Sequence, residues 1–255
     1  MATNEEKVIL LMQENLIGFH VKKENPLKKT IEHLPSPFPS YQVFLGNPQS
    51  AKMSINDKEL KETAVEVVKD HVKMYVHSQY IINLSNSAEY IGELLGQNLR
   101  YARMAGFKGV VVHTGKSVKK SIEDAIDTME TQLRRAMEYA TEDCPILLET
   151  PSGQGTETLT NVDDFIAFIQ RFDGDPRIAI CVDTCHVFAS GSDPLEYLQK
   201  VVKQTRLIHF NDSKTVCGSC IDRHEMIGEG HIGFKKMKKI AEFASEHYID
   251  MLYEG

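Results

Sequence analysis

Residues 178–186, IAICVDTCH, and residues 206–212, RLIHFND, decide the fold class of this chain of 255 residues. Each is a nearly unbroken run of apolar, largely β-branched residues that ends in imidazole and carboxylate side chains. Continuous apolarity of this kind is typical of parallel strands that are buried on both faces. Both stretches are therefore predicted to be strands of a parallel sheet with polar groups at their carboxyl ends.

Six further runs are also nearly continuous in apolar residues, and helical patterns separate most of the runs. The runs are LIGFHV (16–21), YQVFLG (41–46), KMYVHS (73–78), GVVVHT (109–114), PILLET (145–150) and IDMLYEG (249–255). Helices are expected after Asp57 and over 87–105, 121–140, 161–172, 193–202 and 234–246. Eight strand–helix units in this length favour an α/β fold, a closed (β/α)₈ or TIM barrel, as a single domain over 1–255. Because Gly255 follows the eighth strand so closely, we expect no closing helix after it.

Composition gives weaker guidance on partners. The formal net charge is −7, from 29 Lys and Arg against 36 Asp and Glu, which at first argues against a nucleic-acid partner. Divalent ions on several carboxylates would offset that charge, so DNA stays open as a partner. No apolar run reaches the ~18 residues that a membrane span needs, and the N-terminus lacks a secretory pattern. An intracellular protein, cytoplasmic or nuclear, without a membrane partner is expected.

Two of the five cysteines form a C-x-x-C motif, Cys217-Gly-Ser-Cys220. A zinc ribbon needs a second such pair, and the sequence has none. We interpret the two cysteines as ordinary loop thiols, with a redox or regulatory pair as the alternative.

Potential metal ligands recur at the strand ends. They are His77, His113, Glu149, Asp183, His209 and Glu254 near the ends of strands three to eight, with His186, Asp222 and His224 soon after strands six and seven. The carboxyl ends of barrel strands meet on one face, which holds the active site in known barrels. Carboxylates at such density would repel one another unless cations shared the site, and imidazole with carboxylate suits Zn, Mn or Fe(II) better than Mg or Ca. Nine ligands exceed the four of one tetrahedral zinc, so a multinuclear metal site is predicted.

Four motifs resemble the endonuclease IV family of zinc-dependent apurinic/apyrimidinic endonucleases, which are xylose-isomerase-like TIM barrels. The motifs are HSQYIINLS (77–85), ETPSGQG (149–155), CVDTCHVFASG (181–191) and, within 209–233, HFNDSK followed by GSCIDRHEMIGEGHIG. The likeness runs from about Ile17 to Glu254. It implies three zinc ions, with Mn²⁺ or Fe²⁺ also suited to some sites. The implied ligand groups are His77, His113 and Glu149; Glu149, Asp183, His209 and Glu254; and His186, Asp222 and His224.

The resemblance also implies a reaction. A monomer would bind double-stranded DNA and hydrolyse the phosphodiester 5′ to an abasic site, leaving a 3′-hydroxyl and a 5′-deoxyribose phosphate. Glu149 or Glu254 would orient or deprotonate the attacking water, and Glu254 is the expected general base. Tyr80 matches an aromatic residue that packs near the site in the family, with packing in the core as the alternative.

Three residues near the predicted site bear on DNA contact. Gln49 occupies the place where family members commonly carry an arginine that enters the DNA stack; a plain loop role is the alternative. Cys220 takes a position that is often basic. Arg223 remains, for either a phosphate contact or a structural pairing.

Two other functions fit the same pattern less well. One is a sugar isomerase or epimerase of the xylose-isomerase-like barrels, whose sites usually hold one or two metals where nine ligands here suit three. The other is a metal-bound protein that binds damaged DNA or another phosphate ligand without turnover, which an intact ligand set argues against.

Overall fold

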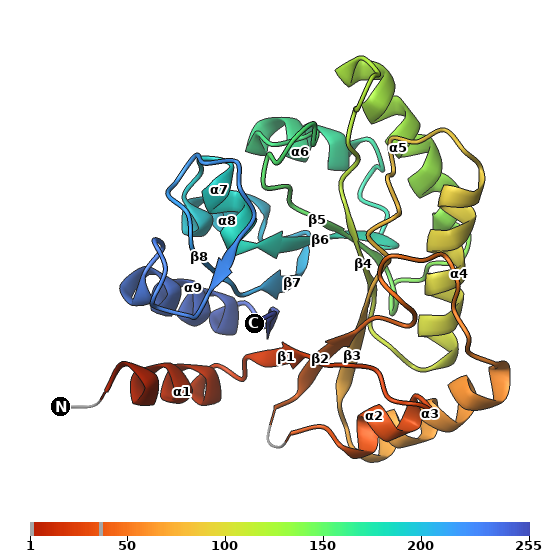
Figure 1. Ribbon diagram of the computed structural model, residues 1–255, viewed down its shortest axis with the longest axis horizontal. Helices are drawn as coiled ribbons and strands as arrows, with labels where there is room; N and C mark the ends of the chain where they lie inside the picture. Colours follow the sequence, from red (N-terminus) through yellow and green to blue (C-terminus); the bar gives the residue numbers. More distant parts are fainter. Residues whose placement is uncertain (1–2, 36–37) are drawn as a thin grey trace.

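A closed parallel barrel is the centre of the computed structural model, which describes residues 3–35 and 38–255 (Figure 1). Around the barrel the strands follow the order β1, β10, β7, β6, β5, β4, β3 and β2. They span Gly18–His20 (β1), Ser40–Val43 (β2), Lys73–His77 (β3), Val110–His113 (β4), Ile146–Glu149 (β5), Ile178–Asp183 (β6), Thr205–His209 (β7) and Asp250–Tyr253 (β10). The predicted (β/α)₈ barrel is thereby confirmed. β10 closes it by pairing with β1, and the sequence runs two residues past β10.

Helices surround the barrel on its outside (Figure 1). They span Asn4–Glu14 (α1), Lys28–Glu32 (α2), Asp57–Lys69 (α3), Tyr90–Met104 (α4), Ile122–Met137 (α5), Val162–Gln170 (α6), Thr184–Ala189 (α7), Pro194–Val201 (α8) and Phe234–Glu246 (α9). Every helix that the patterns predicted is present, whereas α1, α2 and α7 were not predicted. Among the residues described, no helix combines the length and the apolar character that crossing a bilayer requires.

The predicted boundaries of α4 are right at one end only. Gly106, with φ of 74°, follows its carboxyl end as expected of a residue that leaves a helix in the left-handed region. The predicted start at residue 87 is wrong, because the helix begins at Tyr90 and Glu89 precedes it without a side-chain cap. The intervening residues instead form a turn, in which Asn86 Oδ1 accepts the backbone N–H of Ala88 at 2.9 Å.

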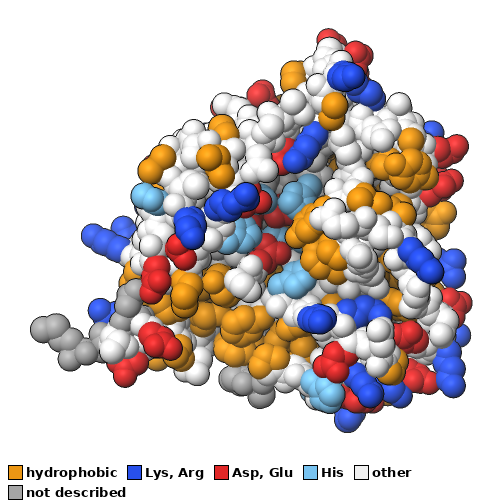
Figure 2. All heavy atoms as spheres, viewed as in Figure 1, with side chains coloured by type: hydrophobic (Ala, Val, Ile, Leu, Met, Phe, Trp, Pro, Cys, Tyr) orange, Lys and Arg blue, Asp and Glu red, His pale blue; other side chains and the backbone are white. Residues whose placement is uncertain are grey.

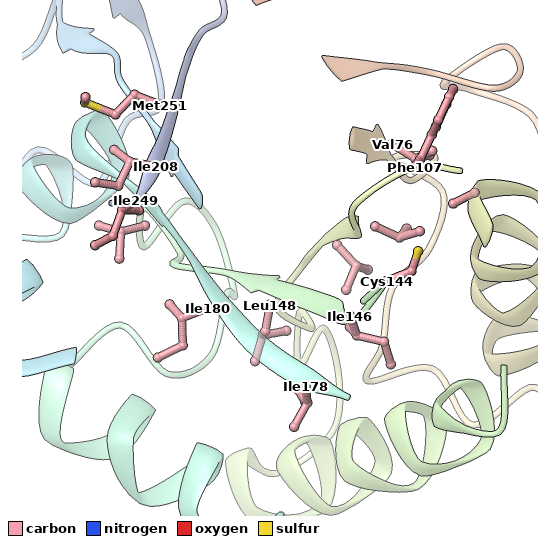
Figure 3. Close-up of a cluster of buried hydrophobic side chains, with 14 of the residues drawn as sticks. Val76, Phe107, Cys144, Ile146, Leu148, Ile178, Ile180, Ile208, Ile249 and Met251 are labelled. Atoms are coloured by element: carbon pink, nitrogen blue, oxygen red, sulfur yellow. The ribbon is translucent and has the colours of Figure 1, made fainter. Parts of the chain in front are cut away.

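The strands divide their side chains between two apolar layers. Residues such as Ile146, Leu148 and Ile178 point from the sheet toward the helices and belong to the larger core (Figure 3). A second, smaller cluster comprises Tyr75, Val111, Leu147, Ala179, Cys181, Leu207 and Leu252. Because side chains alternate along a strand, this second cluster fills the barrel interior. Its members also determine which side chains at the strand ends point inward.

The two stretches that predict the fold do not remain strands to their last residue. β6 ends at Asp183, whose Oδ1 accepts the backbone N–H of His186 at 2.8 Å and so caps α7. β7 ends at His209, and the chain continues into a short antiparallel hairpin of β8 (Asp212–Ser213) and β9 (His224–Glu225). The predicted strands over 178–186 and 206–212 are therefore too long. Residues 184–186 belong to α7, and Asp212 belongs to β8 of the hairpin.

Candidate metal centre

The polar side chains of the centre follow from the inner layer of the barrel. Each member of the pairs Tyr75/His77, Val111/His113, Leu147/Glu149, Cys181/Asp183, Leu207/His209 and Leu252/Glu254 is two residues from its mate. Side chains two residues apart lie on the same face of a strand. The second residue of each pair therefore points into the barrel mouth, directly above an apolar interior.

The first group of ligands surrounds one oxygen of Glu149. Its Oε2 lies 3.4 Å from His77 Nε2 and 3.3 Å from His113 Nε2. This oxygen is buried and has no hydrogen-bond partner among the described residues. His77 Nδ1 donates to the carbonyl of Ser78 at 2.8 Å, which leaves Nε2 free to face Glu149. A buried carboxylate oxygen without a partner is costly, and a cation among these three side chains would satisfy it.

The second group shares Glu149. His209 Nδ1 lies 2.9 Å from Glu149 Oε1, 3.1 Å from Glu254 Oε2 and 3.9 Å from Asp183 Oδ2. One ligand atom from each of these four residues lies within 4.8 Å of the others. Three carboxylates surround one imidazole in this group, which again suits a divalent cation.

The third group is centred on Asp222, which the β8–β9 hairpin brings over the mouth. Its two oxygens lie 3.2 Å from His186 Nε2 and 3.3 Å from His224 Nε2. His186 Nδ1 contacts the carbonyl of Thr150 at 2.8 Å, so Nε2 is again the free nitrogen. Asp183 Oδ2 lies 3.7 Å from His224 Nε2, which puts this carboxylate between the second and third groups.

All nine predicted ligands thus come together at one place. A cavity of about 490 Å³ is lined by seven of them, namely His77, His113, Glu149, His186, Asp222, His224 and Glu254. The other two, Asp183 and His209, are fully buried. Figure 2 shows pale-blue histidine and red carboxylate side chains gathered in a hollow on the viewed face.

Crowding shifts the protonation of the group in both directions. Burial raises the pKa of Glu149, but the neighbouring imidazoles of His113 and His209 outweigh it and hold that pKa well below its ordinary value. Burial also raises the pKa of Asp183, and there it prevails. Burial lowers the pKa of His224, but the hydrogen bond to Asp222 and the nearby carboxylates outweigh it and raise the pKa to about 9. Without cations the centre therefore holds protons at neutral pH.

The three predicted DNA-contact residues lie differently. Tyr80 is 52% exposed and lines the cavity, with its ring 5.4 Å from that of His77 and 5.7 Å from that of His113. Gln49, on the loop after β2, is exposed and lines the cavity as well. Arg223 is exposed and is not among the lining residues; its Nη1 donates to the carbonyl of Asp222 at 2.7 Å. The structure therefore brings Tyr80 and Gln49 to the cavity but leaves Arg223 outside it.

The two loop cysteines lie between β8 and β9. Cys217 and Cys220 are both exposed and free. Cys185, which the motif analysis did not single out as a ligand, is buried, and its sulfur lies within 4.8 Å of ligand atoms of Asp222 and His224. Burial raises the pKa of the Cys185 thiol to about 12, so it stays protonated at neutral pH without a cation.

Several buried polar residues around the ligands were not predicted. Asn211 Nδ2 donates to Asp183 Oδ2 at 2.7 Å and to Glu254 Oε2 at 3.2 Å, so one amide joins two ligands. Gln42 and His20 form a similar set of contacts with Glu254. The signal was available in the sequence, because Gln42 and Asn211 are amides within the apolar runs YQVFLG and RLIHFND. Buried amides in such runs need partners, and here the partners are ligands.

Comparison with known proteins agrees with this fold. The family model described as a xylose isomerase-like TIM barrel matches residues 37–248. The solved structure of endonuclease IV from Thermus thermophilus superposes with a TM-score of 0.79 and 22% identity, covering 94% of this chain and 91% of that one. The class is therefore that of the xylose isomerase-like barrels.

Curated relatives narrow the class further. A putative endonuclease 4 from Acanthamoeba polyphaga mimivirus is 33% identical over 238 residues, which cover 84% of this chain and 76% of the relative. A probable endonuclease 4 from Streptomyces avermitilis is 34% identical over 233 residues, covering 84% of this chain and 75% of the relative. The chain belongs to the endonuclease IV family.

Cation binding by the metal-free protein is expected to release protons. Imidazole binds a cation only in its neutral form. Because the pKa of His224 is raised to about 9, this residue is protonated at pH 7 and must lose its proton to bind. Apparent zinc affinity should therefore rise from about pH 6 to about pH 9. Calorimetric titration in buffers of different ionisation enthalpy measures the released protons, and heats that do not depend on the buffer would contradict the expectation.

Proposed function

We propose that this protein is a DNA-repair endonuclease that hydrolyses the phosphodiester on the 5′ side of an abasic site. The products would be a 3′-hydroxyl and a 5′-deoxyribose phosphate. The observation that carries the proposal is the convergence of nine imidazole and carboxylate side chains at one barrel mouth, seven of them lining its cavity, in a chain of the endonuclease IV family. We further propose that it acts as a monomer on double-stranded DNA inside the cell, in base excision repair.

The donor set supports three zinc ions. His77, His113 and Glu149 would hold one, Glu149 would share a second with Asp183, His209 and Glu254, and His186, Asp222 and His224 would hold the third. When bound, zinc polarises phosphate oxygens and stabilises the charge that develops on the leaving oxygen. The mixture of neutral imidazole and carboxylate is compatible with Mn²⁺ or Fe²⁺ in some positions.

Glu254 is proposed to take the proton of the attacking water. It lines the cavity, and its side chain keeps 14% exposure, whereas Glu149 is almost completely enclosed by imidazoles. Burial raises the pKa of Glu254, but His209 and His20 outweigh it, so the carboxylate is ionised at neutral pH. An ionised, reachable carboxylate can accept a proton, whereas Glu149 is better placed to orient the cations.

Lesion recognition is proposed to occur at the rim. Tyr80, a half-exposed aromatic residue, and Gln49, an uncharged amide, both line the cavity. Moving the sugar-phosphate out of the duplex requires the least energy where no base is stacked. Tyr80 would then pack against the extrahelical sugar, and Gln49 would approach the gap left in the stack.

The direct test is cleavage of a labelled duplex that carries one abasic analogue. We expect zinc-replete protein to cut on the 5′ side of the lesion and Glu149→Gln to lose about 10³-fold or more in rate, since removal of a shared ligand disrupts two cation sites. The readout is the position and rate of strand scission on a denaturing gel.

Two results would contradict the proposal. Protein that binds its metals but leaves the duplex intact would point to a binding role or to sugar chemistry. Conversion of an aldose to a ketose by the same preparation would identify the isomerase alternative.

A second expectation concerns Gln49. Gln49→Arg adds a positive charge at the rim of the cavity, where the proposed DNA contact would place it beside a phosphate. Binding to the abasic duplex should tighten, and the slope of log K against log salt concentration should steepen by about 0.9. Fluorescence anisotropy across a salt series measures both, with Gln49→Ala as the uncharged control. Equal slopes for the arginine and alanine variants would show that Gln49 lies outside the DNA contact.

A further inference from the structure

Gln42 on β2 is a fully buried amide in the barrel interior, and the proposed chemistry does not use it. Its backbone pairs in register with His20 of β1 and Tyr75 of β3. Tyr75 belongs to the inner layer of the barrel, and the outward-pointing neighbours Tyr41 and Val43 belong to the outer core. Gln42 therefore points into the barrel, beside Tyr75 and just below the ligand His77.

The polar contacts of this side chain are with His20 and with two predicted ligands, Glu254 and His209. Gln42 Nε2 donates to Glu254 Oε1 at 2.7 Å and lies 3.0 Å from His20 Nδ1. Gln42 Oε1 lies 2.9 Å from His209 Nε2. Both the nitrogen and the oxygen of the amide are thus in use. One side chain joins two proposed ligands of the second cation.

The orientation of the amide is fixed by Glu254. An ionised carboxylate only accepts hydrogen bonds, so it must face the NH₂ group of Gln42. The opposite orientation would set a carbonyl oxygen against the carboxylate. Gln42 Oε1 consequently faces His209, and because a carbonyl oxygen can only accept, His209 Nε2 must carry the hydrogen.

This contact determines the tautomer of His209. With the hydrogen on Nε2, the lone pair of the neutral ring is on Nδ1. Nδ1 is the atom that faces Glu149 Oε1 at 2.9 Å and Glu254 Oε2 at 3.1 Å. The lone pair therefore points to the centre of the second group, where a cation needs it.

His77 and His186 are oriented in a different way. Each has its Nδ1 2.8 Å from a backbone carbonyl, that of Ser78 or Thr150, and presents Nε2 to the carboxylates. A backbone carbonyl is present whatever the side chains are. His209 instead presents Nδ1, and its Nε2 contacts the side chain of Gln42. A substitution of Gln42 can therefore change the tautomer of His209.

We propose that Gln42 is a positioning residue of the metal centre, which holds His209 in the Nδ1-coordinating tautomer and holds Glu254 beside it. The inference rests on the proposed function, because it requires the second group to bind a cation. Hydrogen-bond partners of metal-bound histidines typically change metal affinity by about 10- to 100-fold. Loss of the Gln42 amide should lower the affinity of the second group for its cation by that factor. The affinities of the other two groups should not change.

The test compares two buried glutamines. Gln42→Met keeps an unbranched side chain of similar size and removes three contacts. Gln132→Met is the matched control: Gln132 is also buried and also makes three hydrogen bonds, to Gly92 N, Asn86 O and Ala88 O, but it lies on α5. Both variants should lose some stability, and only Gln42→Met should change metal binding.

Two readouts are taken on the full chain. Zinc affinity is measured by competition with a chromophoric chelator, and the visible absorption of the cobalt-substituted protein reports the ligand field. We expect Gln42→Met to weaken one site by about 10- to 100-fold and to alter the cobalt spectrum, with Gln132→Met like the parent. If Gln42→Met does not fold, Gln42→Asn, whose amide is too short to span both partners, should give the same weakening.

The outcomes separate the two proposals. A Gln42 variant with the affinities and spectrum of the parent would overturn the role of Gln42 and leave the metal centre standing. A parent protein that binds neither zinc nor cobalt would overturn the metal centre and this inference together.

Discussion

The burial of the Glu149 carboxylate is the constraint on which the rest of the site depends. Its side chain is 2% exposed, and its two oxygens face imidazoles of His77 and His113 on one side and His209 on the other. A carboxylate removed from water is stable only with opposite charge or donors close to both oxygens. The imidazoles supply part of that compensation. Cations shared among the surrounding carboxylates would supply the remainder, and their binding would in turn hold the barrel mouth together.

The barrel meets this constraint through strand alternation. Residues of the inner layer fill the interior, and on six of the eight strands the next inward-facing position carries a ligand. The same rule that builds a dry core therefore places six ligands side by side above it. The remaining three come from α7 and the β8–β9 hairpin, which follow directly on strands that already end in a ligand. Asp183 links the two arrangements, because one of its oxygens caps α7 and the other faces the cluster.

Much of the fold could be predicted from sequence because it depends on local periodicity. Buried parallel strands leave continuous apolar runs, and the long amphipathic helices leave clear stripes. α7 was not predicted, because its residues continue an apolar run and only the cap at Asp183 separates the helix from the strand. α1 was not predicted either, although Thr3 and Glu6 form a capping box, because its apolar residues do not form a single stripe.

The site shows the same division between local and distant information. Ligands at strand ends could be predicted because each follows its own strand. The partners of the buried amide Gln42 could not be predicted, because they lie 167 and 212 residues away and meet it only when the barrel closes. The cavity position of Gln49 and the outward position of Arg223 depend likewise on loop paths that no periodic pattern encodes.

Anomalous X-ray diffraction at the zinc absorption edge, on crystals of zinc-loaded protein, tests the central claim most directly. The account predicts three anomalous peaks in the barrel mouth: one beside Glu149, His77 and His113; one between Glu149 and His209; and one beside Asp222, His186 and His224. Absence of a peak on either side of Glu149 would contradict it, because the buried carboxylate would then be stable without the cations on which the proposed chemistry depends.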